Sequence, residues 1–168
     1  MLRIGFLFAF LLGALASTGA AAAPPLPRFD DGELRPTLLV DGEPFLMLGA
    51  QPNNSSNYPA MLGEVWPVVE RIGANTVLMP VAWEQVEPEE GRFDFSFVDV
   101  LLDQARAREM RLVLLWYGTW KNTGPSYVPA WVKRDTDHFA RMRKPDGSAH
   151  LVLSPHGEAT MQADARAF

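Results

Sequence analysis

A continuous apolar run in the middle of the chain constrains the fold more than any other feature. Residues Thr76 to Trp83 follow a Gly-Ala-Asn turn and show no alternation of polar and apolar side chains. Such a run is typical of a strand that is covered on both faces, as in a parallel sheet between helices. Pro80 argues against a central strand, because proline has no N–H to donate to a neighbour. Despite this proline, the lack of alternation along the run predicts a covered strand and an α/β fold.

The flanking segments predict helices and strands in alternation with this run. Apolar residues at helical spacing predict two helices, at Pro59–Ile72 and Phe97–Glu109. A second apolar run predicts a strand at Leu112–Trp116. Pro67 lies inside the first helix and should kink it or split it in two. Ser96, with Asp99 three residues later, predicts the start of the second helix.

The two ends of the chain show different patterns. Thr37–Leu48 predicts a hairpin around an Asp-Gly turn, and its second strand should run on to Gln51 as the first strand of the parallel sheet. Residues 23–36 are Pro-rich and predict an extended lead-in. Beyond Tyr117 little helical spacing is visible until Met161; a short helical turn at 128–132 and a hairpin around Lys144–Gly147 are predicted within this segment.

Residues 1–22 have the features of a secretory signal peptide. Arg3 gives a positive start, Ile4–Ala16 is an apolar core, and small residues lead to a cleavage site after Ala22. An uncleaved anchor is the alternative, but the core is shorter than the roughly 20 apolar residues of a spanning helix. We therefore expect an exported protein, periplasmic or extracellular, without a stable membrane anchor.

Composition excludes several classes of protein. A net charge of −5 argues against nucleic-acid binding, which usually needs a basic excess. The absence of Cys excludes disulfides and thiolate chemistry, and the three His show no metal-ligand spacing. These residues therefore indicate no metal site, and no residue pattern implies an organic cofactor. Oligomeric state is not predicted.

The central stretch also resembles a known enzyme group. The pattern N-T-V-x(5)-W-E-x-x-E-P-x-x-G-x-F-D-F resembles the second strand and following loop of clan A glycoside hydrolases, and is most similar to β-galactosidase families 35 and 42. The resemblance extends from about Leu38 to Phe168. It implies a (β/α)8 (TIM) barrel, of which 37–168 would be the first three β/α units with an N-terminal β-hairpin, because a complete barrel takes about 250 residues.

The barrel places candidate binding residues at the carboxyl ends of its strands. Aromatic rings that stack on a sugar, and amides or carboxylates that bind its hydroxyls, suit a carbohydrate substrate. The predicted substrate-binding residues are Gln51, Asn53, Trp83, Glu84, Tyr117, Trp120, Lys121 and Asn122.

Each candidate has a structural alternative. Trp83 and Trp116 would serve equally as barrel core, and Glu84 as a salt-bridge partner. Glu87, ahead of Pro88, is expected to fix the turn, and Asn53 and Asn54 have the alternative role of turn formers. Arg141, Arg143 and Lys144 predict a solvated face of the hairpin.

The resemblance places no catalytic residue in this chain. In clan A the acid/base and the nucleophile lie at the ends of strands four and seven, the first usually in an Asn-Glu pair, and the chain contains no such pair. Both are expected beyond Phe168. The sequence thus predicts a β-galactosidase-like, retaining glycoside hydrolase fragment that is inactive alone. A non-catalytic carbohydrate-binding module and an inactive truncated gene product are the alternatives.

Overall fold

The computed structural model describes residues 23–32, 35–122, 124 and 127–168. The predicted signal peptide, residues 1–22, lies outside them. The chain divides into two units, Met1–Leu46 and Met47–Phe168. Within the described parts of both units, no helix has the length and apolar character needed to cross a membrane.

The first unit contains a small antiparallel sheet. Strand β1 (Arg28–Asp30) pairs with β2 (Thr37–Val40), which pairs with β3 (Glu43–Pro44). The β2–β3 turn is the predicted Asp-Gly turn, with φ of 54° at Asp41 and 89° at Gly42. A positive φ at both central residues matches the twist of the strands, which is why this dipeptide favours a hairpin. The predicted hairpin is confirmed.

The prediction that one strand runs from this hairpin to Gln51 is wrong. The β3 strand ends at Pro44, and β4 (Gly49–Ala50) is a separate strand of the second unit. Between β3 and β4 the backbone N–H groups change their hydrogen-bond acceptors. Phe45 still donates to the Leu38 carbonyl at 2.8 Å, whereas Leu48 donates to Asn75 Oδ1 at 2.9 Å.

The second unit is built on a parallel sheet in the order β4–β5–β6, with β5 at Thr76–Ala82 and β6 at Arg111–Tyr117. The β5 and β6 strands pair along their whole length. Pro80 lies in β5, the middle strand of the three, although the sequence argued against a proline in a central strand. The β4 strand pairs only with Thr76 and Val77, so at Pro80 only β6 is a strand partner among the described residues, and a missing N–H is tolerated there.

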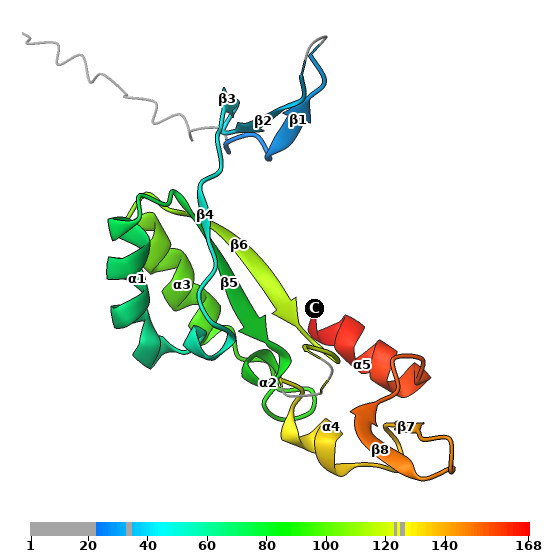
Figure 1. The fold of residues 1–168 in the computed structure, drawn as a ribbon. Helices are drawn as coiled ribbons and strands as arrows, with labels where there is room; N and C mark the ends of the chain where they lie inside the picture. The colour runs from blue at the N-terminus through cyan, green and yellow to red at the C-terminus, as the bar shows by residue number, and fades with distance from the viewer. Residues whose placement is uncertain (1–22, 33–34, 123, 125–126) are drawn as a thin grey trace, which may run out of the picture. The chain divides into compact units, whose positions relative to one another are not determined.

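Two helices cover one face of this sheet. Figure 1 shows α1 (Leu62–Arg71) and α3 (Ser96–Arg106) side by side along it. Their apolar faces pack on β5 in one core cluster, in which Leu62, Trp66, Val77, Met79 and Leu101 are almost fully buried. The α1 helix continues through Pro67, so of the two predicted outcomes, a kink or a split, the split is excluded. Burial of this face stabilises the helix by more than the loss of one backbone hydrogen bond destabilises it.

One helix was not predicted, and the start of another differs from the prediction. The α2 helix (Trp83–Val86) begins at the last residue of the apolar run, so the strand ends at Ala82. In α3, Asp94 accepts from the Ser96 backbone N–H at 2.9 Å, and Ser96 is the first helical residue. The N-cap position is Phe95, which makes no side-chain cap hydrogen bond, so the prediction of Ser96 as the N-cap is wrong by one residue.

The rest of the second unit packs around a second core cluster. The predicted short helix and hairpin are present as α4 (Ala130–Arg134) and the antiparallel pair β7 (Arg141–Arg143) and β8 (Ala149–Leu153). They are followed by α5 (Glu158–Ala167). The cluster buries Trp83, Val128, Val132, Phe139 and Leu153. The α/β prediction is confirmed.

Candidate functional site

The carboxyl ends of the three parallel strands bring polar side chains together. Tyr58 follows β4, between the 3-10 turns Asn54–Ser56 and Pro59–Met61; Glu84 follows β5; Tyr117 ends β6. The Tyr58 hydroxyl donates to Glu84 Oε1 at 3.1 Å, and the Tyr117 hydroxyl donates to Asn54 Oδ1 at 2.7 Å. Side-chain hydrogen bonds therefore link the segment after β4 to the ends of both other strands.

Glu84 lies at the centre of this arrangement. Its Oε1 accepts from Tyr58, its Oε2 is 3.4 Å from Lys133 Nζ, and its side chain stays about one-third exposed. The predicted alternative of a salt bridge is thus present, and it leaves the carboxylate within reach of solvent. Carboxylate lone pairs remain for a ligand hydroxyl, because two oxygens offer about four acceptor sites.

The electrostatics of the pair fix the proton on Tyr58. Burial, followed by the Glu84 charge and the hydrogen bond to it, raises the pKa of Tyr58 to about 12. The phenol therefore remains a donor at physiological pH. Glu84 is held as an acceptor between a phenol and an ammonium group, a setting that suits hydrogen bonding to a sugar hydroxyl better than proton transfer.

Gln85 and Asn57 form a second link that orients Glu84. The Gln85 Oε1 accepts from the Ala82 N–H at 2.9 Å and from Asn57 Nδ2 at 3.1 Å, and Gln85 Nε2 donates to the Asn57 carbonyl. Asn57 is fully buried. These bonds hold the first turn of α2 against the segment after β4. Gln85, Asn57 and Tyr58 were not singled out from the sequence, although all three follow strand ends.

Aromatic groups border the same edge. The Tyr117 ring lies 5.1 Å from that of Tyr127 and is covered by Lys121, whose Nζ is 4.4 Å from the ring centroid. Trp120 is 42% exposed and is held through Nε1, which donates to the Leu153 carbonyl at 3.0 Å. It borders two cavities, one of about 530 Å³ and one of about 360 Å³. Among the predicted aromatic residues, Trp120 has the ring most open to a sugar.

Trp83 lies in the core, where a ligand cannot contact its ring. Its ring is fully buried, packs edge-on against Trp131 at 5.8 Å, and donates through Nε1 to Glu87 Oε2 at 2.9 Å. Glu87 is itself 1% exposed and accepts from the Gly91 N–H at 2.8 Å. Trp83 is therefore a core residue and Glu87 fixes the turn, which are the structural roles that the sequence offered as alternatives to sugar binding.

The remaining predicted residues occupy turns. Asn53 Oδ1 accepts from the backbone N–H and the hydroxyl of Ser55, at 3.1 and 3.0 Å, and so forms a turn. Gln51 is exposed and borders, with Asn53, a cavity of about 270 Å³ beside α1. Asn122 has a φ of 52°, the left-handed conformation that Asn tolerates in a tight turn.

Asp164 on α5 positions the segment after β6. Its Oδ1 accepts from Trp116 Nε1 at 2.7 Å, and its Oδ2 accepts from the Thr119 N–H at 2.7 Å and from the Thr119 hydroxyl. A Cβ at Gly118 would collide with this carboxylate, so the contact requires glycine there. No local pattern pointed to Asp164, because its partners are more than forty residues earlier in the chain.

Metal binding finds no support at this edge. Across the described residues, no group of three or more His, Cys, Asp or Glu side chains is placed to hold a metal ion. The arrangement offers hydrogen-bond acceptors, a phenol, an ammonium group and one open indole ring.

Comparisons with known proteins place most of this chain in one family. The model of the family described as β-galactosidase, glycoside hydrolase family 42, matches residues 51–150. Two Arabidopsis thaliana proteins are similar in sequence: β-galactosidase 14 is 25% identical over 67% of this chain, and β-galactosidase 11 is 27% identical over 62%. The chain spans only 14% and 13% of their lengths.

Two solved structures are also similar. The exo-β-1,4-mannosidase Op5Man5 from Opitutaceae bacterium strain TAV5 is 24% identical, with a TM-score of 0.44 over 58% of this chain and 19% of its own. Endo-glycoceramidase II from Rhodococcus sp., solved as a lactosyl-enzyme intermediate, is 19% identical, with a TM-score of 0.42 over 62% of this chain and 28% of its own.

Proposed function

Since the chain belongs to the β-galactosidase family, glycoside hydrolase family 42, we propose that it is the amino-terminal part of an exported enzyme that hydrolyses terminal β-galactosides. The parallel sheet β4–β5–β6 would be the first part of a (β/α)8 barrel. The small antiparallel sheet of the first unit would precede this barrel in the chain. Residues 1–22 would direct export and be removed.

The reaction in the complete protein would be hydrolysis with retention of configuration. Such enzymes use two carboxyl groups about 5–5.5 Å apart, one as acid/base and one as nucleophile. We assign both to residues outside this chain. A glycosyl-enzyme intermediate formed in this way needs neither a metal nor an organic cofactor.

This chain would supply part of the wall that binds the sugar. The observation that carries the proposal is the Tyr58–Glu84 pair at the strand ends. A pyranose hydroxyl can donate to the open side of the Glu84 carboxylate. Trp120 would stack on the apolar face of a sugar ring, and the Lys121 ammonium over Tyr117 would donate to a ring or hydroxyl oxygen.

The test is a comparison between this chain and the complete protein. We expect the complete protein to release β-galactose first from a chromogenic β-galactoside, as followed by proton NMR, and this chain to release none. Exchanging Glu for Gln in the Asn-Glu pair that should end strand four would abolish most turnover and leave sugar binding largely intact. Release of the α-anomer would contradict the mechanism. Binding without turnover by the complete protein would favour a carbohydrate-binding module.

A further inference from the structure

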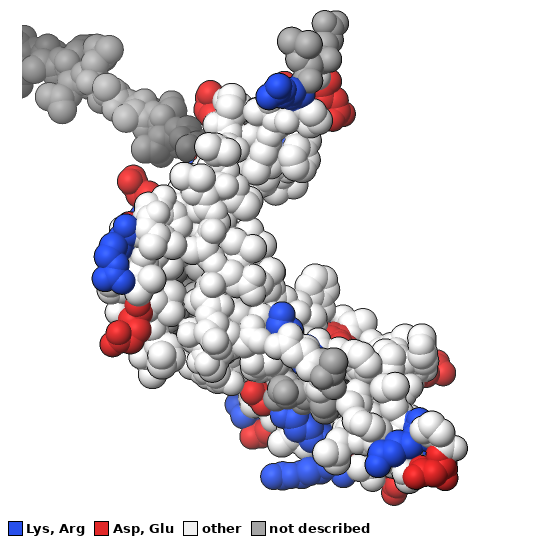
Figure 2. Space-filling view, in the orientation of Figure 1, with Lys and Arg blue, Asp and Glu red and all other residues white. Residues whose placement is uncertain are grey.

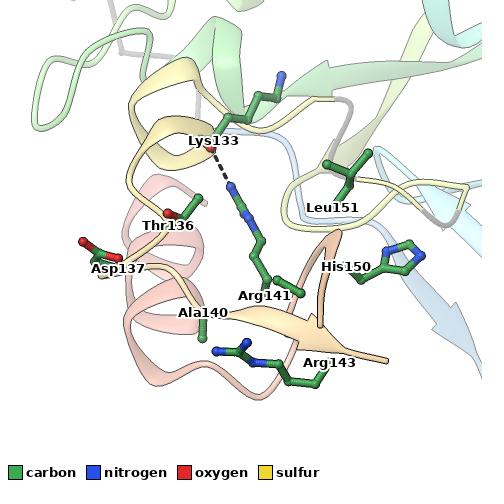
Figure 3. A pocket seen from close by; sticks show the side chains of 9 residues that line it. Lys133, Thr136, Asp137, Ala140, Arg141, Arg143, His150 and Leu151 are labelled. Atoms are coloured by element: carbon green, nitrogen blue, oxygen red, sulfur yellow. Dashed lines mark hydrogen bonds between the residues drawn. The ribbon is translucent and has the colours of Figure 1, made fainter. Parts of the chain in front are cut away.

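A second cavity lies between α4 and the β7–β8 hairpin. Its volume is about 820 Å³, within the usual range of small-molecule pockets. Figure 3 shows the Arg141 side chain running through it from β7 toward Lys133, with Thr136 on one side and Leu151 on the other. The sequence predicted a solvated face for this arginine. The structure instead turns it inward and leaves it only partly exposed.

Arg141 has no anionic partner among the described residues. Its Nη2 donates to the Lys133 carbonyl oxygen, but its Nη1 is shielded from solvent and has no acceptor. A shielded guanidinium nitrogen without a partner is rare, since the lost hydration is normally replaced by a carboxylate, a carbonyl or a bound ion. The arginine is therefore an uncompensated positive charge at the wall of a cavity.

The other groups on the cavity wall add to the positive charge. Lys133 and Arg143 are cations, and Asp137 is the one carboxylate among the described residues that line the cavity. Figure 2 shows Lys and Arg side chains around α4 and the hairpin on the face in view, with Asp and Glu side chains among them. His150 also borders the cavity, but Figure 3 shows its ring pointing away from Arg141.

The cavity is connected to the strand-end site through one residue. Lys133 pairs with Glu84 through its ammonium group and accepts from Arg141 through its carbonyl oxygen. Lys133 therefore contacts both Glu84 at the strand ends and Arg141 at the cavity. A guanidinium group favours planar or tetrahedral oxyanions, because its N–H groups form a fixed fork.

We propose that this cavity binds the oxyanion of an acidic sugar residue, a carboxylate or a sulfate ester, next to the galactoside site. The inference rests on the proposed function, since it extends the same ligand by one charged residue. Arg141 forms the main contact, with Arg143 as a further donor. A cavity of this volume accommodates a sugar ring as well as its charged group.

Calorimetric titration of the full chain tests the proposal with four probes. They are digalacturonate, galactose 6-sulfate, neutral galactobiose and sodium sulfate. We expect one of the two acidic sugars to bind about tenfold or more tightly than galactobiose, as one charge-assisted hydrogen bond allows. Arg141→Gln should abolish this difference and Arg141→Lys should restore part of it. Arg106→Gln, an equivalent change on α3 outside the cavity, should leave it unchanged.

The other outcomes separate the two proposals. Equal affinity for acidic and neutral sugars would overturn the acidic site alone, whereas binding of no sugar would remove both. Sodium sulfate binding as tightly as the acidic sugars would overturn the sugar assignment. If Arg141→Gln does not fold, Arg143→Gln replaces it, and unchanged discrimination in that variant would overturn the proposal.

Discussion

Replacing Asp164 by Asn should destabilise the second unit. The substitution keeps the shape of the side chain but converts one carboxylate oxygen to an amide nitrogen, which cannot accept a hydrogen bond. If the amide oxygen faces Thr119, the new NH2 group faces the Trp116 indole N–H, and one charge-assisted hydrogen bond is lost. Hydrogen bonds to charged groups contribute about 1.5–3 kcal/mol, so the free energy of unfolding should fall by about that amount.

Urea unfolding followed by tryptophan fluorescence measures this loss. The midpoint should fall without a change in m, because the surface exposed on unfolding is the same. Asp103→Asn is the matched control: Asp103 is 81% exposed and pairs with Arg106 at 3.6 Å, so its loss should cost less than about 0.5 kcal/mol. Equal midpoints for the Asp164 and Asp103 variants would refute the assignment of Asp164 as the residue that holds the segment after β6.

Three further predictions follow from the same contacts and from the sequence. Glu84→Gln should lower the pKa of Tyr58 from about 12, though not fully to 10 because burial also raises it; an ultraviolet titration should show the Tyr58 step at lower pH, and an unchanged one would contradict the Tyr58–Glu84 pair. Because Tyr58 gives up its proton at lower pH when unfolded than when folded, stability should fall as pH rises from about 10 to about 12, and denaturant midpoints over that range measure it. Amino-terminal sequencing of exported protein should begin after Ala22; an intact Met1 on membrane-bound protein would contradict cleavage.

Apolar patterning predicted most elements of the second unit. The runs that became β5 and β6, and the helical spacing of α1 and α3, reflect burial, which acts along each segment and is visible in the local sequence. The errors lie where one local contact decided the outcome. The α3 helix begins at Ser96, whose N–H donates to Asp94 in the preceding turn, and packing of α1 on the sheet maintains the helix through Pro67.

The candidate site was predictable only in part. The rule that parallel strands end at one edge pointed to Glu84, Tyr117 and Trp120, which the structure places there. It could not show that Trp83, one residue before Glu84, is a core residue rather than a binding residue, because the rule does not tell which way a side chain turns. Lys133 and Asp164 were not found, because each contacts its partner across more than forty residues.

The central claim is that the strand-end edge binds a galactoside. The five Trp side chains give five indole N–H signals in a nitrogen-15 NMR spectrum, so titration with a β-galactoside reports on each of them. We predict that the Trp120 signal shifts and saturates, that the buried Trp66 and Trp83 signals stay in place, and that Glu84→Gln weakens the apparent affinity. No shift at Trp120 at saturating sugar, or equal shifts at the buried tryptophans, would contradict the account.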